Sequence, residues 1–168
     1  MTERDRRDPT VDRPVIPREY GVPTTTEGLL DWATVERRLA AARAYWLASV
    51  DSDGRPHVRP VDGIYVDGVL YVGGSDEARW VRNLEAAPQV SVHLDGPDVI
   101  IVEGEAKLLH GVPGELAERL AAASNAKYPE YGMTAESYAG PGPFAIGPRK
   151  VIAWTDFARN PTRFRFDP

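Results

Sequence analysis

The chain has 168 residues, 42% of them hydrophobic, which fits a single domain with a sizeable core. Its formal net charge of -5 argues against a nucleic-acid partner, because neutralising phosphates requires a concentrated positive surface. There is no cysteine, which excludes disulfides, thiolate metal sites and cysteine nucleophiles. We find neither a signal peptide nor an apolar run of transmembrane length, so we expect a cytoplasmic protein without a membrane partner.

Residues 1–27 are rich in charge and proline and show little periodicity, which predicts an extended N-terminal arm ahead of one domain over residues 28–168. Two interpretations of the arm remain open. It is either a disordered tail, or its segment RPVIPREYGVP (13–23) lies in extended form over another surface. Asp31 then resembles an N-cap, and apolar residues at helical spacing follow it up to Arg43.

Alternating and apolar segments after this helix predict a mainly antiparallel β domain. The expected strands are 44–50, 56–66, 69–73, 89–94, 99–109, 150–157 and 162–166. Further helices are expected over 77–87 and 114–127, and a Gly/Pro/Tyr-rich loop over 128–148. Six or seven strands with two or three flanking helices are typical of a small β-barrel with attached helices.

The segment GRPHVRP (54–60) is unusually polar for a strand. Its prolines, Pro56 and Pro60, cannot donate to a ladder, so they place the strand at a sheet edge, a bulge or a barrel rim. Alternation puts His57, Arg59 and Val61 on one face and Val58 on the other. We therefore expect a polar face that meets a ligand.

The segment GGSDEARW (73–80) leads from a strand into a helix. Gly73 and Gly74 free the backbone, and Ser75 can cap the helix. Exposed backbone N–H groups and the helix dipole favour an anion here, and Arg79 and Arg82 add charged donors. The pattern predicts a phosphate cradle.

Other polar residues do not form a convincing catalytic or metal site. His57, His93 and His110 are dispersed and lack carboxylate companions at ligand spacing, so we predict no metal. Glu103 and Glu105 share a strand face, but such a pair is more often solvated or tied to an arginine. No catalytic residue is assigned.

Four motifs occur together and in order: WLAS (46–49), DGRPH (53–57), RNL (82–84) ahead of a proline, and VEGEA (102–106). In this combination the chain resembles the pyridoxamine 5′-phosphate oxidase-like split β-barrel family, in particular its flavin/deazaflavin oxidoreductase branch, from about Trp32 to Phe166. The resemblance implies a split β-barrel and a homodimer with two cofactor sites at the subunit interface.

The resemblance also implies positions for the cofactor. The ring would be lined by His57, Val58, Arg59, Pro60 and Val61, and the phosphate and ribityl chain would be held by Gly73, Gly74, Ser75, Arg79, Arg82 and Asn83. Trp80 stands where the family usually has a lysine, so Arg79 and Arg82 are expected to replace that cation. Trp80 itself either stacks on the cofactor ring or packs into the core.

The implied activity is hydride transfer from coenzyme F420, or from FMN as second choice, to a small unsaturated or heteroaromatic substrate. F420 comes first because the long arm and the RNL element look closer to the deazaflavin users. A true pyridoxamine-phosphate oxidase is disfavoured because the closing segment NPTRFRFDP lacks the histidine of that group's substrate motif. The alternative is a non-catalytic cofactor-binding or haem-handling protein, with His57 or His93 as the axial ligand.

A homodimer is also expected from the residues themselves. Tyr45, Trp46, Ile64 and Tyr65 would expose aromatic and apolar surface on an isolated barrel, and pairing two chains would cover it.

Overall fold

The structure, a computed structural model, describes residues 8–166, and these form one antiparallel sheet flanked by helices. The strands are β1 (Thr10–Asp12), β2 (Tyr45–Val50), β3 (Pro56–Val61), β4 (Ile64–Val66), β5 (Val69–Val72), β6 (Gln89–His93), β7 (Val99–His110), β8 (Pro141–Trp154) and β9 (Thr162–Arg165). The helices are α1 (Trp32–Ala41), α2 (Arg79–Ala86) and α3 (Gly114–Lys127), with short 3-10 turns η1 (Arg18–Tyr20), η2 (Pro129–Tyr131) and η3 (Ala135–Tyr138).

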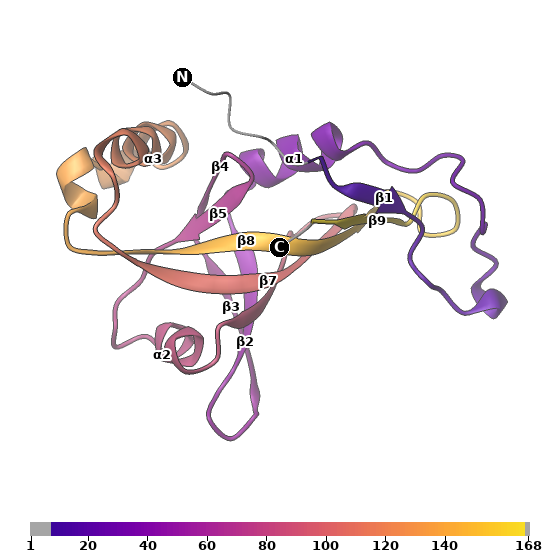
Figure 1. Ribbon diagram of the computed structural model, residues 1–168, viewed down its shortest axis with the longest axis horizontal. Helices are drawn as coiled ribbons and strands as arrows, with labels where there is room; N and C mark the ends of the chain where they lie inside the picture. Colours follow the sequence, from indigo (N-terminus) through magenta and orange to yellow (C-terminus); the bar gives the residue numbers. More distant parts are fainter. Residues whose placement is uncertain (1–7, 167–168) are drawn as a thin grey trace.

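The sheet runs in the order β1-β9-β8-β7-β6-β2-β3, while β5 pairs with β8 and carries β4. It does not close on itself, so the predicted mainly β split barrel is confirmed. Helices α1 and α3 lie on one side of the sheet, and α2 lies on the other side next to β2 and β3 (Figure 1). Among the described residues, no helix is long and apolar enough to cross a membrane.

The described sheet has nine strands rather than six or seven, for three local reasons. The predicted strand 56–66 is broken at Asp62 and Gly63 into β3 and β4. Part of the predicted arm forms β1, which pairs with β9. The Gly/Pro-rich part of the predicted loop 128–148 enters β8 from Pro141 onward, because Phe144 and Ile146 are buried and pair with β5 and β7.

Two glycines permit irregular pairing between β7 and β8. A Cβ on Gly104 would lie 2.3 Å from the carbonyl oxygen of Gly147, next to the register shift at Glu103/Gly104. A Cβ on Gly142 would lie 2.6 Å from the carbonyl oxygen of Leu109, near the second shift. Only glycine allows these close backbone approaches, which explains the glycine of VEGEA.

The predicted helices are present with small changes at their ends. Asp31 caps α1, since its Oδ1 accepts a 2.8 Å hydrogen bond from the Thr34 amide. The N-cap of α2 is Ala78, not Ser75. Ser75 Oγ instead accepts from the Glu77 amide at 3.2 Å, so it stabilises the turn that precedes the helix.

The main core lies between the sheet, α1 and α2, and a smaller one lies beneath α3. Tyr45 is fully buried and Ile64 is 9% exposed within a single chain. The expectation that these two side chains expose apolar surface on an isolated barrel is therefore wrong. Trp46 and Tyr65 are half-buried.

Candidate functional site

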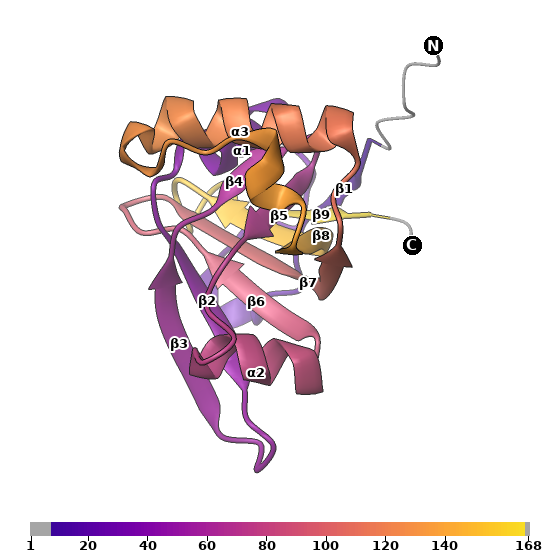
Figure 2. The ribbon, with the colours of Figure 1, turned by 90° about the vertical axis from the view of Figure 1, so that its left-hand side faces the viewer.

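Strand β3 is an edge of the sheet: along the strand order it follows β2 and has no partner on its other side within residues 8–166. This explains Pro56 and Pro60, because an edge strand tolerates residues that cannot donate. The β2–β3 hairpin extends past α2, and α2 runs across the base of β2, β3 and β6 (Figure 2). The predicted site residues on β3 and α2 are thereby brought to one end of the molecule.

The register of β3 against β2 divides the predicted ring-lining residues between two faces. His57 lies opposite Ser49, Arg59 opposite Leu47 and Val61 opposite Tyr45, all of them on β2 positions that are buried. Val58 and Pro60 lie opposite Ala48 and Trp46, on the outer face of the sheet. The strand therefore offers one polar face beside α2 and one apolar face outside it.

His57 is the most unusual side chain of the inner face. Its Nε2 is buried and has no hydrogen-bond partner among the described residues. Burial lowers the pKa of His57, and the positive charges of Arg79 and Arg59 lower it further, against a smaller opposing effect of Asp51. The imidazole is therefore neutral at pH 7, with an unsatisfied ring nitrogen beside two arginines.

Three guanidinium groups gather around β3 and α2. Arg79 Nη2 donates to Asp51 Oδ2 at 2.7 Å, and 48% of the Arg79 side chain remains exposed. Arg82 Nη1 donates to the Glu77 carbonyl oxygen at 2.6 Å. Arg59 is exposed and makes no hydrogen bond or ion pair with the part of the chain that the structure describes. Each arginine thus retains donors for an external anion.

Asp51, in the turn between β2 and β3, was not singled out as a site residue from the sequence, yet it orients Arg79. Backbone N–H groups of Arg55 and Asp53 and the Arg79 guanidinium hold the pKa of Asp51 below its usual value, with the Arg55 hydrogen bond contributing most. No local pattern links Asp51 to a residue 28 positions later. Only the folded hairpin reveals this pair.

The glycine loop before α2 is open at one glycine and tightly packed at the next. A Cβ on Gly73 would meet no atom within 4 Å, so the packing of the chain itself does not require this glycine. A Cβ on Gly74 would lie 2.3 Å from Trp80 Cζ2. Trp80 is buried and its ring centroid is 6.0 Å from that of Phe144. Of its two predicted roles, Trp80 therefore takes the packing one.

Asn83 is likewise buried in α2. Its Nδ2 donates to Ser49 Oγ at 3.1 Å, which ties α2 to β2 directly beneath His57. The amide positions the helix that carries Arg79 and Arg82. Ser49, the last residue of the WLAS motif, was not predicted from the sequence to make this contact.

These residues fit an anionic, ring-bearing cofactor of the flavin type. The open space at Gly73, the orphan His57 Nε2 and the donors of Arg59, Arg79 and Arg82 all lie at the β3–α2 end of the barrel. Trp80 supplies no cation, so the arginines carry the whole positive charge of the cradle. Within the described chain, no three His, Asp or Glu side chains are grouped to hold a metal ion.

The sheet is an open antiparallel split barrel, and its polar edge strand lies beside a glycine loop that leads into a helix. This arrangement is typical of small split-barrel proteins that bind a cofactor. The chain belongs to the pyridoxamine 5′-phosphate oxidase family, whose sequence model matches residues 32–155. This confirms the resemblance seen in the sequence. No curated protein is similar enough to this chain to count as a match.

Solved structures share the fold at low sequence identity. An FAD-binding protein from Mesorhizobium loti is 23% identical, with 82% of this chain and 96% of that one covered and a TM-score of 0.57. A heme-binding protein from Mycobacterium smegmatis is 21% identical, with 78% of this chain and 57% of that one covered and a TM-score of 0.61. An F420 reductase is 19% identical, with 76% of this chain and 98% of that one covered and a TM-score of 0.51.

Proposed function

We propose that the protein is an oxidoreductase that binds a flavin-type cofactor, coenzyme F420 in first place and FMN in second, against β3 and the 73–75 loop. Its substrate is a small unsaturated or heteroaromatic compound. The observation that supports this most is that Arg59 and Arg79 lie beside His57, whose Nε2 is unpartnered among the described residues, while Arg82 follows Arg79 by one turn of α2. Two of the similar structures, an FAD-binding protein and an F420 reductase, agree with it.

The cofactor supplies the hydride, and the side chains of this protein hold and orient it. Arg79, fixed by Asp51, and Arg82 bind the phosphate as charge-assisted donors. His57 offers a neutral ring nitrogen to a polar edge of the cofactor, and the open side of Gly73 admits close approach of the ribityl chain. No side chain is assigned as a proton donor.

The arginines provide the direct test. Replacing Arg79 or Arg82 with alanine should remove a charge-assisted hydrogen bond, which is about 1.5–3 kcal/mol or roughly one to two decades in affinity for F420 or FMN. Titration of both cofactors against wild type, Arg79→Ala and Arg82→Ala measures this. Arg37→Ala, on the exposed side of α1, is the control and should bind as wild type does.

Equal affinities across all four proteins would show that the phosphate is held elsewhere and that the cradle is assigned wrongly. Melting curves recorded for each protein separate lost affinity from lost fold. Absence of binding of both cofactors to the wild type would reject the proposed function itself.

A second candidate, haem handling, rests on His57 alone. A neutral histidine with a buried, unpartnered Nε2 has the chemistry of an axial haem ligand, and one similar structure is a heme-binding protein. A visible spectrum of the purified protein with added haem discriminates the two. A haem spectrum that is lost in His57→Ala, together with no affinity for F420 or FMN, would favour haem.

A further inference from the structure

A cavity of about 260 Å³ lies beyond the proposed cofactor site, between the β3–β4 bend, α3, the turns η2 and η3, and the start of β8. Gly73 and Gly74 of the glycine loop line it, and so do Asp62 and Gly63, which directly follow β3. The cavity is thus continuous with both segments to which the cofactor is assigned. It is smaller than the roughly 300–1,000 Å³ of a typical drug-sized site, so it suits one or two fused rings.

Tyrosines dominate the wall of this cavity: Tyr71, Tyr128, Tyr131 and Tyr138. Tyr128 Oη donates to the Arg43 carbonyl oxygen at 2.6 Å, Tyr131 Oη donates to Asp62 Oδ2, and Tyr138 is hydrogen-bonded to Ser124. Tyr128 and Tyr131 are stacked with ring centroids 5.4 Å apart. Because their hydroxyl groups are engaged within the protein, these three tyrosines offer the cavity ring surface rather than free donors.

The charge at this wall is negative. Asp62 is the one charged residue among the described residues that line the cavity, and it stands exposed at the mouth. Two cations near Tyr128 are engaged within the protein: Lys127 Nζ donates to Gly63 O at 3.1 Å and to Tyr45 Oη at 3.0 Å, while the Arg43 guanidinium lies 5.1 Å from the Tyr128 ring centroid. Neither of them lines the cavity.

On the basis of the cofactor site proposed above, we propose that this cavity is the substrate subsite and that it selects planar aromatic compounds that are uncharged or carry one positive charge. Ring faces attract a flat aromatic body and, by their quadrupole, a cation. Asp62 adds attraction for a positive substituent at the mouth. A phosphate ester or a carboxylate would meet the Asp62 carboxylate and find no cation among the residues that line the cavity, so the cavity rejects it.

A matched series of probes on one scaffold tests the charge rule: naphthalen-1-ylmethanol, naphthalen-1-ylmethylammonium, 1-naphthoate and 1-naphthyl phosphate. Calorimetric titration uses the full chain without cofactor and with both Arg79 and Arg82 replaced by alanine. The anions are then not captured by the empty phosphate cradle, and the result does not depend on activity. We expect the ammonium to bind about fivefold tighter than the alcohol, and the two anions at least about tenfold weaker than the alcohol.

Two variants tie the binding to this cavity. Asp62→Asn keeps a hydrogen-bond acceptor for Tyr131 but removes the negative charge, so the affinities for the ammonium and the alcohol should come within about twofold of each other. Asp53→Asn, at the tip of the β2–β3 hairpin, is the control and should leave both affinities unchanged. Tyr131→Ala should weaken the affinity for every bound probe by about five- to tenfold. Tyr20→Ala should not, although Tyr20, on the N-terminal segment, is 60% exposed against 52% for Tyr131.

Equal affinity for all four probes, tightest binding of the phosphate, or no binding of any probe would overturn the proposal. F420 and FMN titrations on the wild-type protein keep the two claims apart. Selective aromatic binding without cofactor binding would overturn the oxidoreductase function, and with it the role of substrate subsite. Cofactor binding without charge selection would overturn the substrate class alone.

Discussion

At the scale of single residues, Trp80 shows how one substitution shifts the chemistry of a site. Its ring fills the space next to Gly74 and packs against Phe144. The family usually has a lysine at this position, whereas here the side chain is part of the hydrophobic core. Sequence reasoning reached both possible roles of this tryptophan but could not choose, because burial depends on residues more than 60 positions away. Arg79 and Arg82 are therefore the cations that this chain offers to the phosphate.

Trp80→Lys should therefore destabilise the protein and leave cofactor affinity no tighter. The change leaves a cavity beside Phe144 and buries an unpaired cation, for a loss of about 3–5 kcal/mol in the free energy of unfolding. Denaturant unfolding measures the loss, and Trp80→Phe, which keeps an aromatic ring, should cost less. Tighter F420 or FMN binding by Trp80→Lys with unchanged stability would contradict the packing role.

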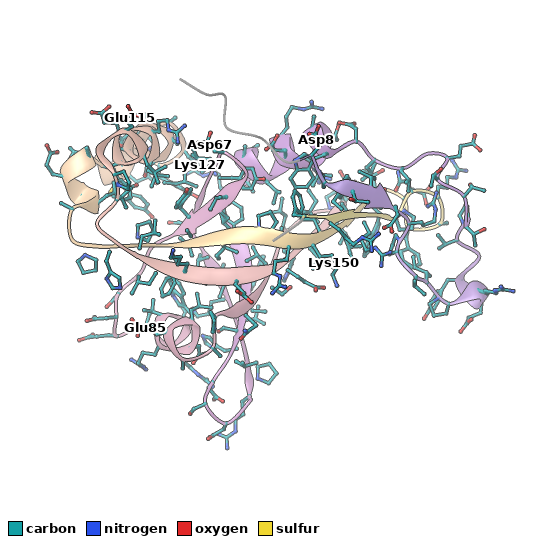
Figure 3. The ribbon with its side chains drawn as sticks, in the orientation of Figure 1. Asp8, Asp67, Glu85, Glu115, Lys127 and Lys150 are labelled. Atoms are coloured by element: carbon teal, nitrogen blue, oxygen red, sulfur yellow. The ribbon has the colours of Figure 1, made fainter. Side chains whose placement is uncertain are left out.

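Lys127, labelled beside α3 in Figure 3, makes stability depend on pH. Burial, and then the charge of Arg43, lower its pKa from 10.5 to about 8. Between pH 8 and about 10 the unfolded chain binds more protons at this residue than the folded one, so its contribution to stability rises with pH. Above pH 10 the trend should reverse, because Tyr45 and Tyr128 have raised pKa values and ionise more readily when unfolded.

Thermal melts of wild type and Lys127→Gln at pH 7.5, 8.5 and 9.5 test this titration. The glutamine keeps hydrogen-bond donors toward Tyr45 and Gly63 but cannot titrate, so the wild type should gain Tm relative to the variant as the pH rises. Lys107→Gln, an exposed lysine on β7, is the control and should track the wild type. A constant difference between wild type and Lys127→Gln would show that Lys127 has an ordinary pKa.

At the scale of elements, the sequence predicted the helices and most strands, because periodicity and capping are local signals. Alternation and hairpin turns located β2, β5, β6 and β7 to within a residue or two. The strands that the sequence did not predict form by pairing with strands that are distant in the chain. β1 has three residues and exists through pairing with β9, and the glycine- and proline-rich start of β8 is a strand because β5 and β7 flank it.

Besides the pairing of β1 with β9, Arg13 holds the part of the N-terminal segment that follows β1. The Arg13 guanidinium donates to the carbonyl oxygens of Thr25 at 2.7 Å, Glu27 at 2.8 Å and Arg159 at 2.9 Å. It thus joins the segment after β1 to the loop before β9. Whether this segment also reaches a neighbouring subunit, as the sequence suggested for residues 13–23, stays a prediction.

Arg13→Ala should loosen the segment after β1, while β1 stays paired with β9 and the barrel stays folded. Loss of these charged donors should cost about 1–2 kcal/mol in the free energy of unfolding and expose residues 13–27 to protease. Limited proteolysis with mass spectrometry, alongside a melting curve, measures both effects. Arg18→Ala in the exposed turn η1 is the control, and equal cleavage rates in the two variants would show that Arg13 does not anchor the segment.

At the scale of the whole molecule, the open sheet has an outer face that α2 does not cover. Trp46 and His93 stack there with ring centroids 6.1 Å apart, and Val58 is 49% exposed beside them. A cavity of about 540 Å³ continues this face past Ala48 and Ser91 to the ion pair between Glu103 and Lys150, the latter labelled in Figure 3. An apolar strip rimmed by charge is typical of a protein interface.

We propose that two copies pair through this outer face, which would set β3 of each copy at the interface and make each cofactor site a shared one. Val58→Glu should then dissociate the dimer, because pairing would bury an unpaired carboxylate at a cost of several kcal/mol. Light scattering at micromolar concentration should give twice the chain mass for wild type and the single chain mass for Val58→Glu. Ala122→Glu adds the same carboxylate at an exposed position of α3, and it should remain dimeric. A monomeric wild type would reject pairing altogether, whereas a dimeric Val58→Glu would move the interface away from β3, and with it the reason for expecting both subunits to contribute to one cofactor site.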